Sequence, residues 1–241
     1  MKDLSFLKNN LIAHRGLHNK DIPENSIPAF KNAIKNNYII ELDIHLLKDN
    51  TIIVFHDDNL QRMTTKNIEL KNTTYGKIKN LKLNNTNYTI STLSEVLKLV
   101  SGKVPLIIEL KYDRKVGLLE QELVKQLDDY KGNFCIKSFR PQTVRWFKKN
   151  KPDYIRGLLV HYKNSTLLDK LILSKLMIWI CKPDFISCNY KLYNNKKIKK
   201  YMKKKPVLAW TIKNDKTYHL YKDKFYNLII DDDTFIDEKI V

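Results

Sequence analysis

Cysteine is scarce in this chain of 241 residues, which contains only Cys135, Cys181 and Cys188. The three are widely spaced, no C-x-x-C pair occurs, and an odd number cannot all pair within one chain. This pattern argues against a disulfide framework and is typical of reduced, buried thiols in a reducing compartment.

Glycine and proline are also few, at 6 and 7 residues, which excludes collagen-like and linker-dominated chains. Apolar residues make up 43% and aromatic residues 10%, enough for a real core, so wholesale disorder is excluded. At roughly 150 residues per domain, the length predicts one large domain or two small ones.

A long apolar run is missing as well. Charged residues and asparagines interrupt the first 16 residues, where a signal peptide would be continuously apolar. The most apolar stretch, 167–180, is interrupted by Asp169, Lys170 and Lys175 and is too short to cross a bilayer. We therefore expect a cytoplasmic protein without a transmembrane segment, while peripheral contact with a membrane surface stays open.

Acidic residues are outnumbered: 26 Asp and Glu stand against 44 Lys and Arg, a formal net charge of +18. Such a balance suggests an anionic partner, namely phosphate, nucleic acid or acidic lipid. However, Lys, Asn and Ile are enriched along the whole chain, and AT-rich coding produces the same bias. The basic runs carry no nucleic-acid-binding motif and no regular aromatic interleaving, so we expect no nucleic-acid partner. The oligomeric state stays open.

Short apolar runs alternate with longer amphipathic ones. Eight predicted strands start near residues 11, 38, 104, 133, 156, 184, 206 and 228, and helical segments separate most of them. Repeated βα units with continuously apolar strands predict a parallel sheet covered on both faces, and eight units fit a (β/α)₈ TIM barrel. A doubly wound open sheet is the alternative, weakened because no glycine-rich nucleotide fingerprint follows any strand. The first long helix is predicted over 23–36.

A small insertion is predicted after the second strand. Runs 38–47 and 51–56 are joined through Asp49 and Asn50, which suggests a hairpin with a two-residue turn that pairs Asp43 with His56. The following residues, 57–87, are polar and only weakly periodic. We expect one domain over 1–241, with 44–90 an insertion made of a hairpin and an irregular segment. Ser91 then looks like the N-cap of the next helix.

Chemistry in such a barrel lies at the carboxyl ends of the strands. Glu41 and Asp43 are two residues apart, so both point to one face of the second strand, where they repel each other. Glu109 adds a third carboxylate from the neighbouring strand. A divalent cation, Mg²⁺ or Ca²⁺, would resolve the conflict, and pairing with nearby Arg or Lys is the alternative.

Two histidines are predicted to flank this site. His14 ends the first strand, and the hairpin would carry His56 to the carboxylates. Two imidazoles beside one site suggest a general base and a general acid. The other four histidines are interpreted as structural: His18, His45, His161 and His219.

Several segments have a recognisable pattern: HRG at 14–16, PENSIPAF at 23–30, ELDIHLLKDNTIIVFHDDNLQRMT at 41–64 and IELK at 108–111. STLSEVL at 91–97 and AWTI at 209–212 add to it. Together they resemble the glycerophosphodiester phosphodiesterase family, densely over 11–111 and sparsely beyond. The stretch IIDDDT at 229–234 departs from the family, in which many members carry a neutral or mixed turn ending in Pro. Its three successive acids are expected at the mouth of the barrel, where they would alter the preferred charge of the substrate.

The resemblance implies a TIM barrel with a small insertion after the second strand, a divalent metal, and hydrolysis of glycerophosphodiesters to glycerol 3-phosphate and an alcohol. Carried over by position, the acid–base pair would be His14 and His56, the metal ligands Glu41, Asp43 and Glu109, the phosphate contacts Arg15 and Lys111, and the residue packed near the substrate Trp210. The nucleophile, water or the glycerol 2-hydroxyl, stays open, as does the assignment of base and acid.

Two other functions stay open. A phospholipase-type enzyme would act on intact lipids, with the basic segment 195–205 and the apolar stretch 167–180 against anionic bilayers. A catalytically silent module would only bind phosphate or another anion, which the +18 charge would favour.

Overall fold

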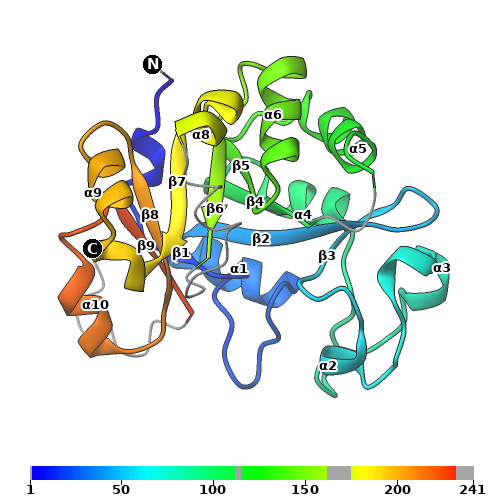
Figure 1. Cartoon of the computed structure of the whole chain (residues 1–241). Helices are drawn as coiled ribbons and strands as arrows, with labels where there is room; N and C mark the ends of the chain where they lie inside the picture. Colours follow the sequence, from blue (N-terminus) through cyan, green and yellow to red (C-terminus); the bar gives the residue numbers. More distant parts are fainter. Residues whose placement is uncertain (1, 112–114, 162–174, 232–241) are drawn as a thin grey trace.

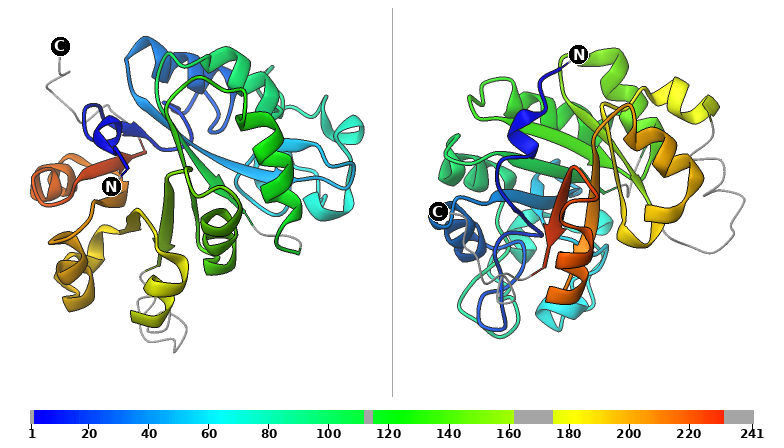
Figure 2. Two further views of the ribbon diagram at one scale, coloured as in Figure 1. Left: turned by 90° about the horizontal axis from the view of Figure 1, so that it is seen from above. Right: turned by 90° about the vertical axis from the view of Figure 1, so that its left-hand side faces the viewer.

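The computed structural model describes residues 2–111, 115–161 and 175–231 of the chain. Within them, eight parallel strands pair in the order β1, β9, β8, β7, β6, β5, β4, β2, and β1 also pairs with β2, so the sheet closes into a barrel (Figure 1). The helices lie outside the strands (Figure 2). The predicted TIM barrel is confirmed, and the open sheet is wrong.

The barrel strands are β1 (Ile12–Ala13), β2 (Ile39–Leu46), β4 (Leu106–Leu110), β5 (Phe134–Ser138), β6 (Arg156–Val160), β7 (Phe185–Asn189), β8 (Val207–Ile212) and β9 (Asn227–Ile230). The longer helices around them are α1 (Ile27–Lys35), α4 (Leu93–Val100), α5 (Leu118–Leu127), α6 (Pro141–Asn150), α8 (Lys175–Cys181), α9 (Lys196–Met202) and α10 (Asp215–Tyr221). Short 3₁₀ helices η1 (Ser5–Leu7) and η3 (Tyr190–Asn194) complete this part.

Apolar side chains fill the amino-terminal end of the barrel. One buried cluster consists of Leu7, Ile12, Ile39, Ile107, Cys135, Phe185, Leu208 and Ile229. Gly157 makes room in it, because a Cβ there would lie 2.3 Å from the Phe185 ring. A larger cluster packs the helices against the outside of the strands. The three cysteines are free and buried, as predicted.

Two helices begin later than predicted. Ser26 caps α1 by accepting a hydrogen bond from the Ala29 N–H, so the helix starts at Ile27 and not at Pro23. Thr92, not Ser91, caps α4, and Glu95 completes the capping box with it. The prediction at Ser91 was therefore one residue early, and Glu95 occupies the ordinary capping-box position.

The hairpin formed by β2 and the antiparallel β3 (Ile52–Val54) has a different register from the predicted one. Leu46 pairs with Ile52, and three residues, 48–50, form the loop, with Asn50 at φ 60°. The strands therefore slip by one residue. Asp43 faces Phe55, whose N–H donates to the Asp43 carbonyl at 3.0 Å, so the predicted pairing of Asp43 with His56 is wrong.

The chain after β3 extends to one side of the barrel and contains α2 (Gln61–Thr64), η2 (Leu70–Asn72) and α3 (Tyr75–Ile78) (Figures 1 and 2). Together with the hairpin it forms a separate buried cluster, which consists of Leu47, Ile53, Phe55, Leu60, Met63, Leu70, Ile78, Leu83 and Ile90. We call residues 44–90 the insertion; the predicted division of the chain at these residues stays a prediction.

Among the described residues, no helix has both the length and the apolar character that crossing a bilayer requires. Most of the predicted apolar helical stretch, 167–174, lies outside the described residues, and its last part belongs to α8.

Candidate active site

Three buried carboxylates meet inside the barrel, two from the middle of β2 and one from near the carboxyl end of β4. The parallel register pairs Asp43 with Glu109, and Glu41 lies two residues before Asp43 on the same face. Their exposed fractions are 0% for Glu41, 1% for Asp43 and 5% for Glu109. One oxygen atom from each lies within 4.8 Å of the others, as the sequence predicted for this trio.

Two lysines offset most of the negative charge of this cluster. Lys111 Nζ lies 2.8 Å from Asp43 Oδ1 and also donates to Glu109 Oε1. Lys137, on β5, places its Nζ 2.8 Å from Glu41 Oε1 and 3.3 Å from Glu109 Oε2. Pairing with lysine, the alternative considered for these acids, is therefore present in this structure.

The pKa shifts follow from these contacts. Burial alone would raise the pKa of Asp43, but Lys111 and Arg15 lower it well below its usual range. Burial opposes ionisation of Glu109 too, yet Lys111 and Lys137 lower its pKa. Burial would lower the pKa of Lys111, and Asp43 and Glu109 raise it instead. Asp43, Glu109 and Lys111 are therefore charged at neutral pH.

Arg15 ties the loop after β1 to the carboxylates. Its backbone, at φ 58°, donates its N–H to Glu41 Oε2 at 3.0 Å. Its guanidinium donates from Nη1 to Glu24 Oε1 at 2.7 Å, and its Nε lies 3.4 Å from Asp43 Oδ2. Asn25 Nδ2 donates to the same Asp43 oxygen at 3.0 Å. Polar contacts with the site thus hold the loop before α1 in place, with Arg15 and Asn25 both at positive φ.

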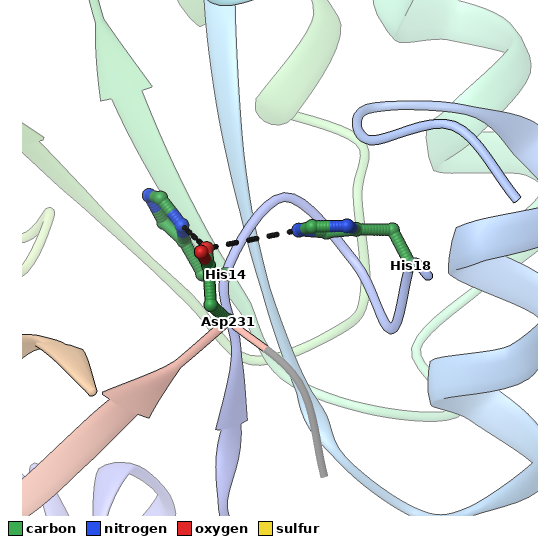
Figure 3. A group of neighbouring side chains, drawn as sticks. All are labelled: His14, His18 and Asp231. Carbon is green, nitrogen blue, oxygen red and sulfur yellow. Dashed lines mark hydrogen bonds and ion pairs between the residues drawn. The ribbon is translucent and has the colours of Figure 1, made fainter. Parts of the chain in front are cut away.

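His14 is held by an aspartate at the end of β9. Its Nδ1 lies 2.6 Å from Asp231 Oδ1, and Figure 3 shows His14 and His18 reaching this carboxylate from different sides. His18 Nε2 is farther away, at 3.7 Å, and Lys213 Nζ lies 2.9 Å from Asp231 Oδ2. Burial would raise the pKa of Asp231, but the hydrogen bond from His14 lowers it. An ionised carboxylate can only accept hydrogen bonds, so the Nδ1 of His14 must carry a proton and donate it to Asp231. The Nε2 of His14 is then the ring nitrogen that can meet a substrate.

His56 has a matching arrangement. Its Nδ1 donates to Asp57 Oδ1 at 2.6 Å, and its carbonyl accepts from His45 Nε2 at 3.1 Å. Burial lowers the pKa of His56, which favours the neutral imidazole. The side chain is one third exposed, at 33%, and can meet a ligand.

Aromatic rings line the barrel beside Trp210. Its ring makes edge-to-face contacts with Phe139 at 5.8 Å and with His161 at 5.3 Å between centroids. Phe139 and His161 stack on each other at 4.7 Å. The Trp210 Nε1–H is buried and has no hydrogen-bond partner among the described residues, so a polar group of a ligand can accept from it.

The carboxylates suit a hard divalent cation. All three donors are oxygens, and at metal–oxygen distances of about 2.4 Å, neighbouring ligand oxygens lie about 3.4 Å apart and opposite ones about 4.8 Å. The spacing within the cluster falls inside that limit. Lys111 shares two of these carboxylates, so a bound cation would compete with its ammonium group.

Some residues of the site were missed in the sequence analysis. They are Glu24, Asp57, Arg62, Lys137 and Asp231. A signal existed for Lys137, because a lysine inside the apolar run 133–139 needs partners just as an acid does. Asp231 was noted among three successive acids but not paired with His14; Asp232 and Asp233 lie outside the described residues.

Fold and site together define a (β/α)₈-barrel protein with two carboxylate-bound imidazoles near a buried, charge-balanced carboxylate cluster. The sequence profile of the Glycerophosphoryl diester phosphodiesterase family matches residues 14–234, and the chain belongs to this family. It is 30% identical over 218 residues to the protein YhdW of Bacillus subtilis, covering 86% of this chain and 87% of that one. It is 33% identical over 165 residues to a glycerophosphodiester phosphodiesterase of Caldanaerobacter subterraneus, covering 64% of this chain and 67% of the relative.

Solved structures agree on the fold. A phosphodiesterase from Oleispira antarctica, in complex with the product sn-glycerol-3-phosphate, superimposes with a TM-score of 0.79 at 22% identity over 93% of this chain and 94% of that one. A glycerophosphodiester phosphodiesterase from Thermotoga maritima gives a TM-score of 0.75 at 22% identity, covering 92% and 95% of the two chains.

Proposed function

We propose that the protein hydrolyses glycerophosphodiesters to glycerol 3-phosphate and an alcohol, with His14 and His56 as its acid–base pair. The observation that carries the proposal is the pair of imidazoles, each bound through Nδ1 to a carboxylate at 2.6 Å, in a barrel of this family. The product named for the Oleispira antarctica protein supports the same reaction class.

The proposed reaction needs one proton removed and one delivered. One imidazole takes the proton from the nucleophile as the oxygen of that nucleophile bonds to phosphorus. With water as nucleophile, glycerol 3-phosphate forms directly; with the glycerol 2-hydroxyl, a cyclic phosphate forms first, and water then opens it in a second step with the two imidazoles in exchanged roles. The bond from phosphorus to the leaving oxygen breaks, and the other imidazole protonates that oxygen. Asp57 and Asp231 favour this cycle, because each stabilises the imidazolium that forms beside it and keeps Nε2 aimed away from itself.

The other predicted site residues would bind the substrate and a divalent cation. Arg15 and Lys111 would bind the non-bridging phosphate oxygens, where negative charge increases in the transition state. Trp210, with the rings beside it, would pack against the substrate. Glu41, Asp43 and Glu109 would hold a divalent cation, Ca²⁺ or Mg²⁺. Such an ion acts as a Lewis acid on phosphoryl oxygens.

The cytoplasm is the location we propose, since Cys135, Cys181 and Cys188 are free and buried. The proposed partner is the glycerophosphodiester itself.

The test is release of glycerol 3-phosphate from glycerophosphocholine with added Ca²⁺, Mg²⁺ or EDTA. We expect hydrolysis that EDTA abolishes and that His14→Ala or His56→Ala lowers by roughly 10²–10⁴-fold. His219→Ala is the matched control, because His219 is exposed on α10, away from the barrel interior, and pairs with Asp215. Full activity in excess chelator would contradict the metal, and no turnover of any glycerophosphodiester would contradict the function.

The same assay separates the alternatives. Faster turnover of phospholipid in anionic vesicles than of glycerophosphocholine would favour the phospholipase-type activity. Salt-sensitive binding of phosphate or DNA without any hydrolysis would favour a silent anion-binding protein.

A further inference from the structure

One side chain of the insertion, Arg62, joins two acids of the site. Arg62 lies on α2 and donates to Glu24 through Nη2 at 2.6 Å and Nη1 at 3.1 Å. It also donates to Asp57 through Nε at 2.6 Å and Nη2 at 3.2 Å. All three nitrogens of its guanidinium are used, so the fork fixes both carboxylates relative to each other.

Each of these acids holds a residue of the proposed reaction. Glu24 Oε1 accepts from Arg15 Nη1 at 2.7 Å, and Asp57 Oδ1 accepts from His56 Nδ1 at 2.6 Å. Arg62 therefore closes a continuous chain of charged hydrogen bonds from the proposed phosphate ligand to one of the two proposed acid–base imidazoles. Without a shared cation, Glu24 and Asp57 would repel each other across the gap that Arg62 fills.

We infer that Arg62 is a positioning residue for the reaction, which aims His56 through Asp57 and Arg15 through Glu24. The inference rests on the proposed function for its kinetic part. Within the described part of the chain, the side chain of Arg62 bonds to Glu24 and Asp57 and to neither imidazole nor any of the three cluster carboxylates, so it acts through the two acids.

The geometry explains why the ring of His56 would depend on Arg62 while its backbone would not. The His56 carbonyl is held by His45 Nε2 at 3.1 Å, a bond that does not involve Arg62. The recorded side-chain hydrogen bond of His56 goes to Asp57 alone. Removing Arg62 frees Asp57 to rotate, so the imidazole loses its fixed angle while the chain around it stays in place.

A purely structural role for Arg62 would predict a loss of stability. The side chain is 47% exposed, and ion pairs at such sites contribute little to folding. The apolar packing of α2 is provided by its neighbour Met63, which belongs to the buried cluster of the insertion. Arg62→Ala is therefore expected to fold, with a midpoint of thermal unfolding slightly below that of the wild type at pH 7, because Glu24 and Asp57 lose the cation that they share.

The kinetic experiment compares Arg62→Ala and Arg62→Lys with Arg145→Ala, an exposed arginine on α6. With glycerophosphocholine, we expect Arg62→Ala to lower kcat by about 10–100-fold, the usual effect of removing a group that orients a reacting residue from behind. We also expect KM to rise several-fold, because Arg15 would be held less firmly against the phosphate. Arg62→Lys should recover only part of the lost kcat, because one ammonium group cannot form two hydrogen bonds to each of the two carboxylates. Added guanidinium should rescue Arg62→Ala and leave Arg145→Ala unchanged.

The leaving group gives a second kinetic readout. An ester with p-nitrophenol needs little protonation of its leaving oxygen, whereas choline needs more. The ratio of the two rates in Arg62→Ala should change as it does in His56→Ala, and differently from His14→Ala. In the double variant Arg62→Ala with Asp57→Asn, the loss of kcat should be smaller than the product of the single losses.

An activity-independent readout separates this inference from the proposed function. Nitrogen-15 spectra of the imidazoles should show the Nδ1–H form of His56 in the wild type and a mixture of tautomers in Arg62→Ala, with His14 unchanged. If the wild type hydrolyses no glycerophosphodiester but the His56 signals still respond, the proposed function fails and the positioning stands. Unchanged His56 signals in Arg62→Ala, or a kcat equal to that of Arg145→Ala, would overturn the positioning role.

Discussion

Each of the two proposed acid–base imidazoles is oriented by an aspartate, but the aspartates come from very different places. Asp57 follows His56 directly, whereas Asp231 is 217 residues from His14 in the chain. The first pair is built into the hairpin, and the second forms only when β9 closes the barrel against β1. Local sequence can therefore indicate the first pair and gives no sign of the second.

Asp231→Asn tests the pair that barrel closure creates. The amide cannot stabilise an imidazolium, and its NH₂ can donate to Nδ1 and favour the wrong tautomer. We expect kcat/KM for glycerophosphocholine to fall by about 10²-fold, measured across pH 5–9. Lys213→Ala is the control, because it removes the other close partner of Asp231 and leaves the carboxylate in place. A near wild-type rate for Asp231→Asn would show that His14 does not need this partner.

Strand registers explain which parts of the site the sequence could predict. Glu41 and Asp43 were placed on one face by the two-residue period of a strand, and the pairing of β2 with β4 brings Glu109 opposite Asp43. Lys137 was missed because its contact with Glu41 depends on the register of β5, a third strand. The lysine inside an apolar run indicated that it needs partners, and naming those partners required the register of β4 and β5.

The hairpin shows the opposite case, where a local rule failed. Asp49 and Asn50 favour a two-residue turn, but Asn50 adopts φ 60° at the end of a three-residue loop. One residue of slip changes every cross-strand partner. The charge of Asp43 nevertheless favours the imidazolium form of His56, against burial, which lowers the pKa of His56. The prediction of the helix starts failed similarly at Ser26 and Thr92, because caps depend on side-chain geometry that composition does not fix.

Lys111 contacts one carboxylate on β2 and one on β4, so its removal is expected to change the affinity of the cluster for a divalent cation. Lys111 lies between Asp43 and Glu109, so Lys111→Met removes a charge that competes for the same oxygens. We expect Ca²⁺ to bind the variant more tightly by roughly tenfold, about 1.4 kcal/mol, although hydrolysis falls because a phosphate contact is lost. Calorimetric titration measures the first effect. Lys125→Met, at an exposed lysine of α5, should leave the affinity unchanged. Equal or weaker binding by Lys111→Met would contradict competition at these carboxylates.

At the scale of the whole molecule, a formal charge of +18 means that positive charges repel one another across the fold, and each ionised acid reduces that repulsion. Several of these acids lie around the site, next to arginine, lysine or histidine side chains. Burial would raise the pKa of Glu24, but Arg62 and Arg15 lower it, and the pKa of Asp57 is lowered in the same way by Arg62 and His56. Protonating such groups both breaks their contacts and adds to the positive charge, so the two effects act in the same direction.

This makes the fold sensitive to acid, with a sign that follows from linkage. The folded-state pKa values of Glu24, Asp43, Asp57 and Asp231 are lowered below their ordinary range, so these groups stabilise the fold above pH about 4. That stability is lost as the pH falls through the folded-state values. Thermal unfolding followed from pH 7 to pH 3 should show a steep decrease in Tm at the acid end.

Substitution separates the site acids from the general effect of charge. Asp57→Asn should have a lower Tm than the wild type at pH 7 and a smaller decrease toward pH 3, because it has no such carboxylate left to protonate. Asp21→Asn, at an exposed position with no ion pair among those recorded, changes the net charge equally and should keep the wild-type slope. Added salt should weaken the acid effect in all three proteins by screening the positive charge. A Tm that stays constant down to pH 3 would show that the ionised acids around the site contribute nothing to the stability of the barrel.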